Sequence, residues 1–171
     1  MPIQRLNHAV LYVRDVEVSV RFYCDVLKFT VITSMGSRGA FLRAPGSTND
    51  HDLGLFAVGP EAADSRAGRG AVGLYHLAWE VTTLGDLETV QHDLADAGAL
   101  VGSSDHGTTK SLYGKDPDGL EFEVVWLIPA HLLSDDIEPG TRRLDLDREI
   151  QRYGRDTRSG LGVSVPLGVT I

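Results

Sequence analysis

Apolar residues recur at a short, strand-like spacing along most of this chain, and at a helical spacing in two places. Residues 6–13 are short and dominated by apolar and β-branched side chains, which favours a strand. Residues 16–28 place Val20, Tyr23 and Leu27 on one stripe, which predicts an amphipathic helix. Three further strands are predicted at residues 29–35, 40–44 and 52–58. The first 58 residues therefore follow the order β-α-β-β-β.

The same order restarts after a linker. Residues 59–71 are small, polar and glycine-rich, which is typical of a linker. A strand at residues 74–81 and a helix that ends at Gly98 come next. Three more strands are predicted at residues 99–104, 109–115 and 120–126. Because His8 and His76 both stand third in the first strand of their module, the repeat indicates an internal duplication. We expect an α+β fold of two βαβββ modules.

The domain boundaries follow from this repeat. We predict one domain over residues 1–127, with module 1 at about 3–58, the linker at 59–71 and module 2 at about 72–127. Residues 128–171 are predicted to form a C-terminal extension. Within it, Asp145 to Tyr153 favours a short, charged helix, and the final stretch, GLGVSVPLGVTI, is expected to pack onto the core or onto a neighbour. No chemistry is assigned to the extension.

Composition narrows the classes of partner. The formal net charge is −8, with 24 acidic against 16 basic residues, and an acidic surface does not attract nucleic acid or anionic lipid. No apolar run approaches the roughly 20 residues that a membrane span needs. The N-terminus lacks the layout of a signal peptide, and the single cysteine, Cys24, excludes an intrachain disulfide. We therefore expect a cytoplasmic protein with neither nucleic-acid nor membrane partners.

Two histidines are the first candidates for chemistry. The apolar neighbours of His8 and His76 predict that both rings are buried, and a buried neutral imidazole needs a hydrogen-bond partner or a metal. For either histidine alone, a satisfied core residue is the simpler interpretation. Their equivalent places in duplicated modules change this balance, because sheets that curl around a shared centre bring both rings toward it.

A carboxylate is the third candidate. Glu123 lies on a strand whose other face carries Phe122, Val124 and Trp126, so its burial without a partner would be costly. The alternative is an exposed strand edge and a solvated carboxylate. Glu121 lies on the same face of the strand as Glu123 but nearer the turn predicted at Asp116–Gly119, so we expect Glu121 to be more exposed. Two histidines and one carboxylate form the facial triad of non-haem iron(II) sites, and Mn(II) or Zn(II) also accepts these ligands.

These features resemble the vicinal oxygen chelate superfamily, which includes glyoxalase I, bleomycin and fosfomycin resistance proteins, and extradiol ring-cleaving dioxygenases. The resemblance covers about residues 3–127. One stretch is similar to the extradiol dioxygenase signature, through His106, Leu112, Tyr113, Asp116, Pro117, Gly119 and Glu123. Ser104 departs from it, since the family expects Gly, Asn, Thr, Ile or Val there.

The resemblance implies a ligand set and a curled mixed sheet around a metal site. It makes His8, His76 and Glu123 the ligands of Fe(II), with Mn(II) as the alternative metal. It also selects Glu123 over Glu121 by the spacing from Gly119.

The resemblance also implies roles around the metal. His51, which enters an apolar strand late in module 1, becomes the candidate acid/base residue. His106 and Tyr113 would hydrogen-bond the substrate oxygens and intermediates. The implied activity is extradiol cleavage of a catechol-type diol by O₂, giving a 2-hydroxymuconic semialdehyde-type product in aromatic hydrocarbon catabolism. A homo-oligomer, a dimer or larger, is implied as well.

Two alternatives stay open at this point. One is a glyoxalase-like, metal-dependent isomerase or lyase. Glyoxalase I carries a fourth ligand, a glutamate, on the last strand of its first module, whereas aligning the two last strands here puts Phe56 near the place of Glu123. The other is a metal-free drug-binding resistance protein on the same fold, which would leave the two histidines and Glu123 unexplained.

Overall fold

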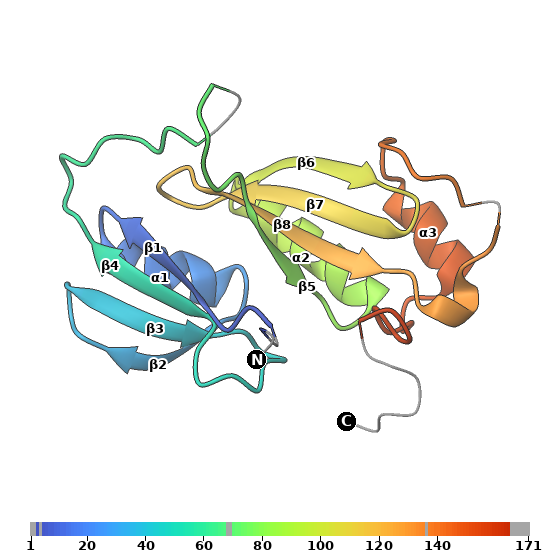
Figure 1. Cartoon of the computed structure of the whole chain (residues 1–171), viewed down its shortest axis with the longest axis horizontal. Helices are drawn as coiled ribbons and strands as arrows, with labels where there is room; N and C mark the ends of the chain where they lie inside the picture. Colours follow the sequence, from blue (N-terminus) through green and yellow to red (C-terminus); the bar gives the residue numbers. More distant parts are fainter. Residues whose placement is uncertain (1–2, 4, 68–69, 136, 165–171) are drawn as a thin grey trace. The chain divides into compact units, whose positions relative to one another are not determined.

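The computed structural model describes residues 3, 5–67, 70–135 and 137–164 (Figure 1). It divides into two compact units. Unit 1 consists of Met1–Arg66 together with Asp116–Leu120, and unit 2 of Ala67–Lys115 together with Glu121–Ile171. Residues 165–171, the end of the predicted extension, lie outside the described residues.

Unit 1 contains one helix and one four-stranded sheet. Its elements are β1 (Ala9–Val13), α1 (Val16–Asp25), β2 (Thr30–Ser34), β3 (Gly39–Arg43) and β4 (Leu53–Ala57). The strand order is β1-β4-β3-β2, with β1 parallel to β4 and the other pairs antiparallel. Asp15 caps α1 through hydrogen bonds to two backbone amides, and the helix buries Val16 and Tyr23.

Unit 2 repeats this topology. Its elements are β5 (Leu77–Glu80), α2 (Leu84–Asp96), β6 (Leu100–Asp105), β7 (Thr109–Lys115), β8 (Glu121–Leu127), a 3-10 turn at Ala130–Leu132, and α3 (Leu146–Tyr153). The order β5-β8-β7-β6, with β5 parallel to β8, matches that of unit 1 strand for strand. The predicted α+β fold with two βαβββ modules is confirmed.

A helix covers one face of the unit 2 sheet, and the residues on the other face are partly exposed. Helix α2 lies on β6, β7 and β8, and Leu84, Leu87 and Leu94 are fully buried. Along β8, Phe122, Val124 and Trp126 are buried, while the residues between them are partly exposed. This alternation is the period of two of a half-buried strand, and it leaves Glu123 on the face that α2 does not cover.

The C-terminal extension packs onto unit 2. The short, charged helix predicted over Asp145 to Tyr153 is found as α3, which begins one residue later because Asp145 is its N-cap. The indole Nε1 of Trp126 donates to the carbonyl of Thr157 at 2.9 Å, and the amide of Leu127 donates to Ser159 Oγ at 2.9 Å. At the start of the final stretch, residues 160 and 161 also form backbone hydrogen bonds, with Leu127 and Ala130, so this part takes the expected placement on the core; the rest of the stretch, from residue 165, lies outside the described residues.

The two candidate histidines stand at matching places, but not inside strands. His8 immediately precedes β1 and His76 immediately precedes β5. The predicted strands begin too early because pairing starts only at Ala9 with Leu53 and at Leu77 with Phe122. The prediction that both rings are buried is wrong, since the His8 side chain is exposed ahead of the paired residues and that of His76 is 25% exposed.

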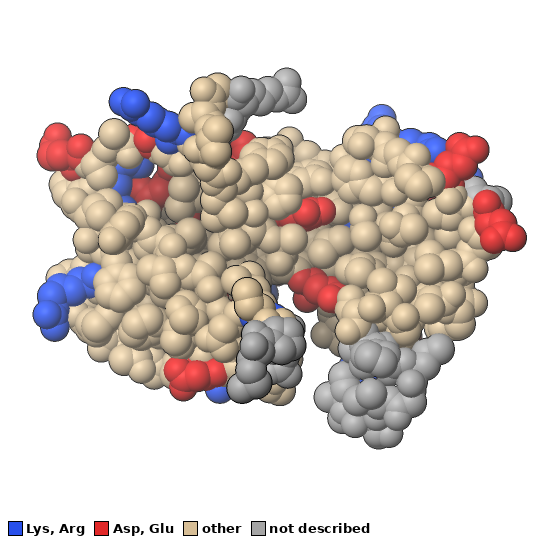
Figure 2. All heavy atoms as spheres, in the orientation of Figure 1, with Lys and Arg blue, Asp and Glu red and all other residues tan. Residues whose placement is uncertain are grey.

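Two surface findings bear on partners. No helix in the described ranges combines the length and apolarity that crossing a membrane requires. On the face drawn in Figure 2, the charged side chains of the described residues are scattered and the basic ones do not gather into one continuous patch.

Candidate metal centre

The turn before β8 runs from Asp116 to Gly119 and is closed by a backbone hydrogen bond. The amide of Gly119 donates to the carbonyl of Asp116 at 2.9 Å, and Gly119 has a φ of 80°, a conformation that glycine adopts without strain. The carboxylate of Asp116 accepts from the amides of Asp118 and Leu120, both at 2.9 Å. This turn ends β7 and starts β8 two residues before Glu123.

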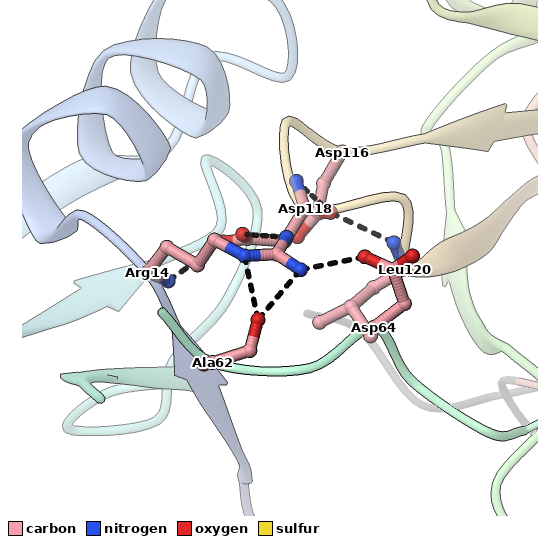
Figure 3. A network of polar contacts seen from close by, with 6 residues as sticks. All are labelled: Arg14, Ala62, Asp64, Asp116, Asp118 and Leu120. Carbon is pink, nitrogen blue, oxygen red and sulfur yellow. Dashed lines mark hydrogen bonds and ion pairs between the residues drawn. The ribbon is translucent and has the colours of Figure 1, made fainter. Parts of the chain in front are cut away.

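The turn is anchored within unit 1 by an arginine (Figure 3). The backbone amide and Nη1 of Arg14 donate to the Asp118 carboxylate at 3.0 and 2.9 Å. The same guanidinium donates to the carbonyl of Ala62 and to Asp64. Burial raises the pKa of Asp116, and its backbone and Tyr23 hydrogen bonds oppose that rise. This polar network is structural, because every donor of Arg14 shown is already engaged.

Glu123 has a histidine partner in unit 2. It lies opposite Tyr113 on β7 and opposite Ala78 on β5. Its side chain is 14% exposed, against 31% for Glu121, which pairs with Lys115 at 3.5 Å. The expectation that Glu121 is the more exposed of the two is therefore confirmed.

The distance between Glu123 and His76 fits a shared ion. Oε2 of Glu123 lies 3.1 Å from Nε2 of His76. Two ligand atoms that would each lie about 2.1 Å from one ion can be at most about 4.2 Å apart, so this separation allows both to hold the same ion. Nε2 is therefore the His76 nitrogen that faces the carboxylate and would bind the ion. The other nitrogen of His76, Nδ1, is buried without a hydrogen-bond partner among the described residues.

His106 and Tyr113 extend this cluster. Nε2 of His106 lies 2.8 Å from the Tyr113 hydroxyl, and the Tyr113 ring is 5.9 Å from the ring of His76. Burial raises the pKa of Tyr113, and the negative charge of Glu123 raises it further, so the hydroxyl keeps its proton at neutral pH. The structure thus brings four of the predicted site residues together in unit 2.

His8 and His51 form a second group, in unit 1. Their rings are 4.5 Å apart, and the ring of Phe41 is 4.7 Å from that of His51. Nδ1 of His51 donates to Asp50 at 2.9 Å, which leaves Nε2 as the acceptor, buried and without a hydrogen-bond partner in the described chain. Nδ1 of His8 donates to Asn7 at 2.8 Å, which likewise leaves Nε2 as the available nitrogen.

The predicted ligands are thus found as a pair and a single residue. His76 and Glu123 belong to unit 2, and His8 belongs to unit 1. Among the residues that the structure describes, no three His, Cys, Asp or Glu side chains form a metal-binding group. The donor types and the distance between His76 and Glu123 nevertheless fit a divalent cation.

The sheet register corrects one expected correspondence. Ala78, two residues after His76, pairs with Glu123, and Val10, two residues after His8, pairs with Gly54. Gly54, and not Phe56, is therefore the module 1 counterpart of Glu123. A Cβ at Gly54 would lie 3.2 Å from the Phe41 ring, so the ring occupies the place where a longer side chain would stand.

Three residues near the site were not singled out from the sequence. The Tyr75 ring lies 4.6 Å from that of His76. The carbonyl of Gly140 lies 3.2 Å from Nδ1 of His106, and Lys110 is buried on β7. Only Lys110 has a signal in the sequence, because it shares the parity of the buried Leu112; its partner Glu149 is too distant in the chain to be predicted.

The sequence model of the Glyoxalase/Bleomycin resistance protein/Dioxygenase superfamily matches residues 5–124. The chain belongs to this superfamily. Its members are typically metal-dependent. The chain is 28% identical over 167 residues to a catechol-2,3-dioxygenase of Bacillus subtilis (strain 168), covering 95% of this chain and 57% of that protein. It is 34% identical over 121 residues to biphenyl-2,3-diol 1,2-dioxygenase 3 of Rhodococcus globerulus, covering 70% of this chain and 62% of that protein. The chain thus spans about three fifths of the length of these two relatives.

Solved structures share the fold. A glyoxylase/bleomycin resistance protein/dioxygenase domain from Frankia sp. EAN1pec has a TM-score of 0.62 at 23% identity, covering 76% of this chain and 96% of that one. The fosfomycin resistance protein FosX of Listeria monocytogenes has a TM-score of 0.54 at 16% identity, covering 72% and 93%. A lactoylglutathione lyase of Agrobacterium tumefaciens has a TM-score of 0.54 at 20% identity, covering 73% and 95%. At these identities the likeness concerns the fold alone.

Proposed function

We propose that this protein cleaves the ring of a catechol-type diol beside its two hydroxyl groups, using O₂ and an Fe(II) ion held by His8, His76 and Glu123. Both atoms of O₂ enter the product, a 2-hydroxymuconic semialdehyde, so no further reductant is needed. The observation that carries the proposal is the distance of 3.1 Å between His76 Nε2 and Glu123 Oε2, next to the hydrogen-bonded pair of His106 and Tyr113. The two relatives named as a catechol-2,3-dioxygenase and a biphenyl-2,3-diol 1,2-dioxygenase support the same chemistry.

Each residue has a task in this proposal. When bound, the iron supplies the binding of the diol and of O₂ and the electron transfer between them. His51, whose Nδ1–H donates to Asp50, offers Nε2 to take the phenolic proton and return it later. Tyr113 keeps its hydroxyl proton and, with His106, is placed to hydrogen-bond the substrate oxygens and intermediates.

The proposed function comes with a domain organisation, a cellular location and an oligomeric state. We propose residues 1–127 as the catalytic domain, with modules at about 3–58 and 72–127 and a linker at 59–71, and residues 128–171 as its extension. We infer a cytoplasmic homo-oligomer, a dimer or larger, that acts in aromatic catabolism on a small aromatic diol. Sedimentation of the purified protein measures the oligomeric state.

The main alternative is a metal-dependent isomerase or lyase on the same scaffold. The observation against a second glutamate ligand is that Gly54 stands in register with the place of Glu123 in the other module. A metal-free drug-binding protein is the second alternative. It predicts that the purified chain holds no tightly bound metal.

The test is O₂ uptake with catechol after anaerobic loading with Fe(II), with the yellow ring-cleavage product followed by absorbance. Glu123→Gln should lose both bound iron and turnover. Glu121→Gln is the matched control, because it changes the same group two residues away on β8 and should leave both unchanged. Iron bound at one per chain without uptake across a panel of catechols would refute ring cleavage and favour the isomerase or lyase.

The acid/base role has a separate test. His51→Phe keeps a ring beside Phe41 and His8, so iron content should be retained while ring opening slows. Undiminished turnover in this variant would remove His51 from the proposed mechanism.

A further inference from the structure

A lysine is buried next to the site without taking part in the proposed chemistry. The Lys110 side chain on β7 is 3% exposed. Its Nζ lies 2.5 Å from Asp105 Oδ1 and 3.1 Å from Glu149 Oε2, and it donates to the carbonyl of Gly107 at 3.2 Å. A buried ammonium is unfavourable unless it is paired and hydrogen-bonded, so these three contacts are what keep Lys110 inside the fold.

Two of the partners of Lys110 are the sequence neighbours of His106. Asp105 ends β6 and Gly107 follows in the turn, so the lysine holds the residues on both sides of His106. Glu149 comes from helix α3 of the C-terminal extension, and its side chain is 8% exposed. The ion triad of Asp105, Lys110 and Glu149 therefore ties the extension to the turn that carries His106.

A loop of the extension, residues 137–142, contacts the same turn directly. Asp105 and Arg142 exchange two backbone hydrogen bonds, both 2.9 Å long. Gly107 packs so tightly against this loop that a Cβ there would lie 2.6 Å from the Glu138 carbonyl oxygen. Two residues before Arg142, the carbonyl of Gly140 accepts from Nδ1 of His106 at 3.2 Å.

The contact with Gly140 decides where the His106 proton lies. A carbonyl only accepts, so Nδ1 carries the hydrogen and Nε2 is left as an acceptor for the Tyr113 hydroxyl at 2.8 Å. Thr141 Oγ1 lies 3.3 Å from the same Nδ1 and can also accept from it. A hydrogen bond to one ring nitrogen commonly fixes both the tautomer and the orientation of a histidine in a site.

We propose that the C-terminal extension is a positioning element of the site: the Asp105–Lys110–Glu149 triad and the 137–142 loop hold His106 with its Nδ1–H on Gly140, so that Nε2 receives the Tyr113 hydroxyl. The catalytic meaning of this arrangement rests on the proposed ring-cleavage function. The arrangement itself depends on contacts within unit 2 alone.

The first variant is Glu149→Gln, which removes the charge that ties α3 to Lys110. Asp147→Asn is the matched control, because Asp147 lies on the same helix but is exposed. Two quantities are measured in the full chain: the tautomer of His106 by ¹⁵N NMR, and kcat with catechol after iron loading. We expect the Nδ1–H signal of His106 to lose population and kcat to fall about 10-fold, as is common for partners of site residues, with iron content unchanged.

A second variant keeps the proposal falsifiable if Glu149→Gln folds poorly. Gly107→Ala inserts a Cβ against the Glu138 carbonyl and should displace the loop from His106, with the same two effects. A wild-type His106 tautomer in a folded variant of either kind overturns the proposal, whatever happens to kcat. An iron-loaded wild-type protein that turns over no catechol refutes the proposed function instead, and the nitrogen signals then decide the positioning role on their own.

Discussion

Replacing Lys110 by methionine should destabilise the protein far more than replacing another lysine on the same strand. Lys110→Met leaves Glu149 and Asp105, whose side chains are 8% and 20% exposed, without their cation. Removing one partner of a buried pair costs about 3–5 kcal/mol, and the partial hydration of Asp105 places our expectation near the lower end, about 3 kcal/mol. Lys115→Met is the control, because Lys115 is 47% exposed and pairs with Glu121 at 3.5 Å. Its loss should cost below about 1 kcal/mol.

Urea unfolding followed by circular dichroism measures both variants. With a denaturant slope of about 2–3 kcal/mol per molar, a loss of about 3 kcal/mol lowers the midpoint by about 1–1.5 M. The double variant Lys110→Met/Glu149→Leu should recover part of this loss, because it removes one of the two stranded charges. A midpoint for Lys110→Met equal to that of Lys115→Met would refute the reasoning, since it would mean that the triad is effectively solvated.

The pH dependence of this difference has a fixed sign. Burial acts to raise the pKa of Asp105, but hydrogen bonds from Lys110 and from the amide of Gly107 outweigh it and lower the pKa. A carboxyl with a depressed folded pKa contributes stability above its unfolded pKa of about 3.9 and loses it as pH falls through the folded value. The stability difference between wild type and Lys110→Met should therefore be full at neutral pH and shrink below about pH 4.

Three further predictions concern other contacts. Tyr23→Phe removes the hydroxyl that donates to Asp116 at 3.2 Å, so the midpoint of urea unfolding should fall by the equivalent of about 1–2 kcal/mol, and an unchanged midpoint would contradict this. Gly54→Ala should lower the melting temperature, with a cost of about 1 kcal/mol, because its Cβ meets the Phe41 ring at 3.2 Å; an equal or higher melting temperature would show that the ring moves freely. Truncation after residue 153 removes the acceptor of the Trp126 indole, so the tryptophan emission should shift to the red, whereas unshifted emission would show that the extension does not cover Trp126.

The module order and the local chemistry of the site could be predicted from sequence. The period of two on β8 placed Glu123 on the face opposite Phe122, Val124 and Trp126, and the nearness of Glu121 to the turn made it the more exposed of the two carboxylates; both expectations hold. The short, charged helix expected over Asp145 to Tyr153 is found at Leu146–Tyr153, because charge and local propensity are signals carried by neighbouring residues. Such features depend on residues a few positions apart, and sequence patterns report them well.

Contacts between distant segments could not be predicted in this way. Periodicity indicates that Lys110 faces inward, but it does not reveal that Glu149 of the extension meets it. The exposure of His8 depends on where pairing with β4 begins, and the pairing register is also what makes Gly54 the counterpart of Glu123. Register and long-range pairing are set by whole strands, so a single residue carries no signal for them.

The turn at Asp116–Leu120 has a consequence for synthesis on the ribosome. Although unit 1 is otherwise complete by Arg66, this turn also belongs to it. Tyr23 and Arg14 therefore emerge from the exit tunnel well before the carboxylates of Asp116 and Asp118 that they bind. Because domains made during translation fold as their residues become available, the amino-terminal sheet forms first, with the Tyr23 hydroxyl lacking Asp116 and with Arg14 bound only to Ala62 and Asp64. Its final hydrogen bonds close only after β7 has been translated.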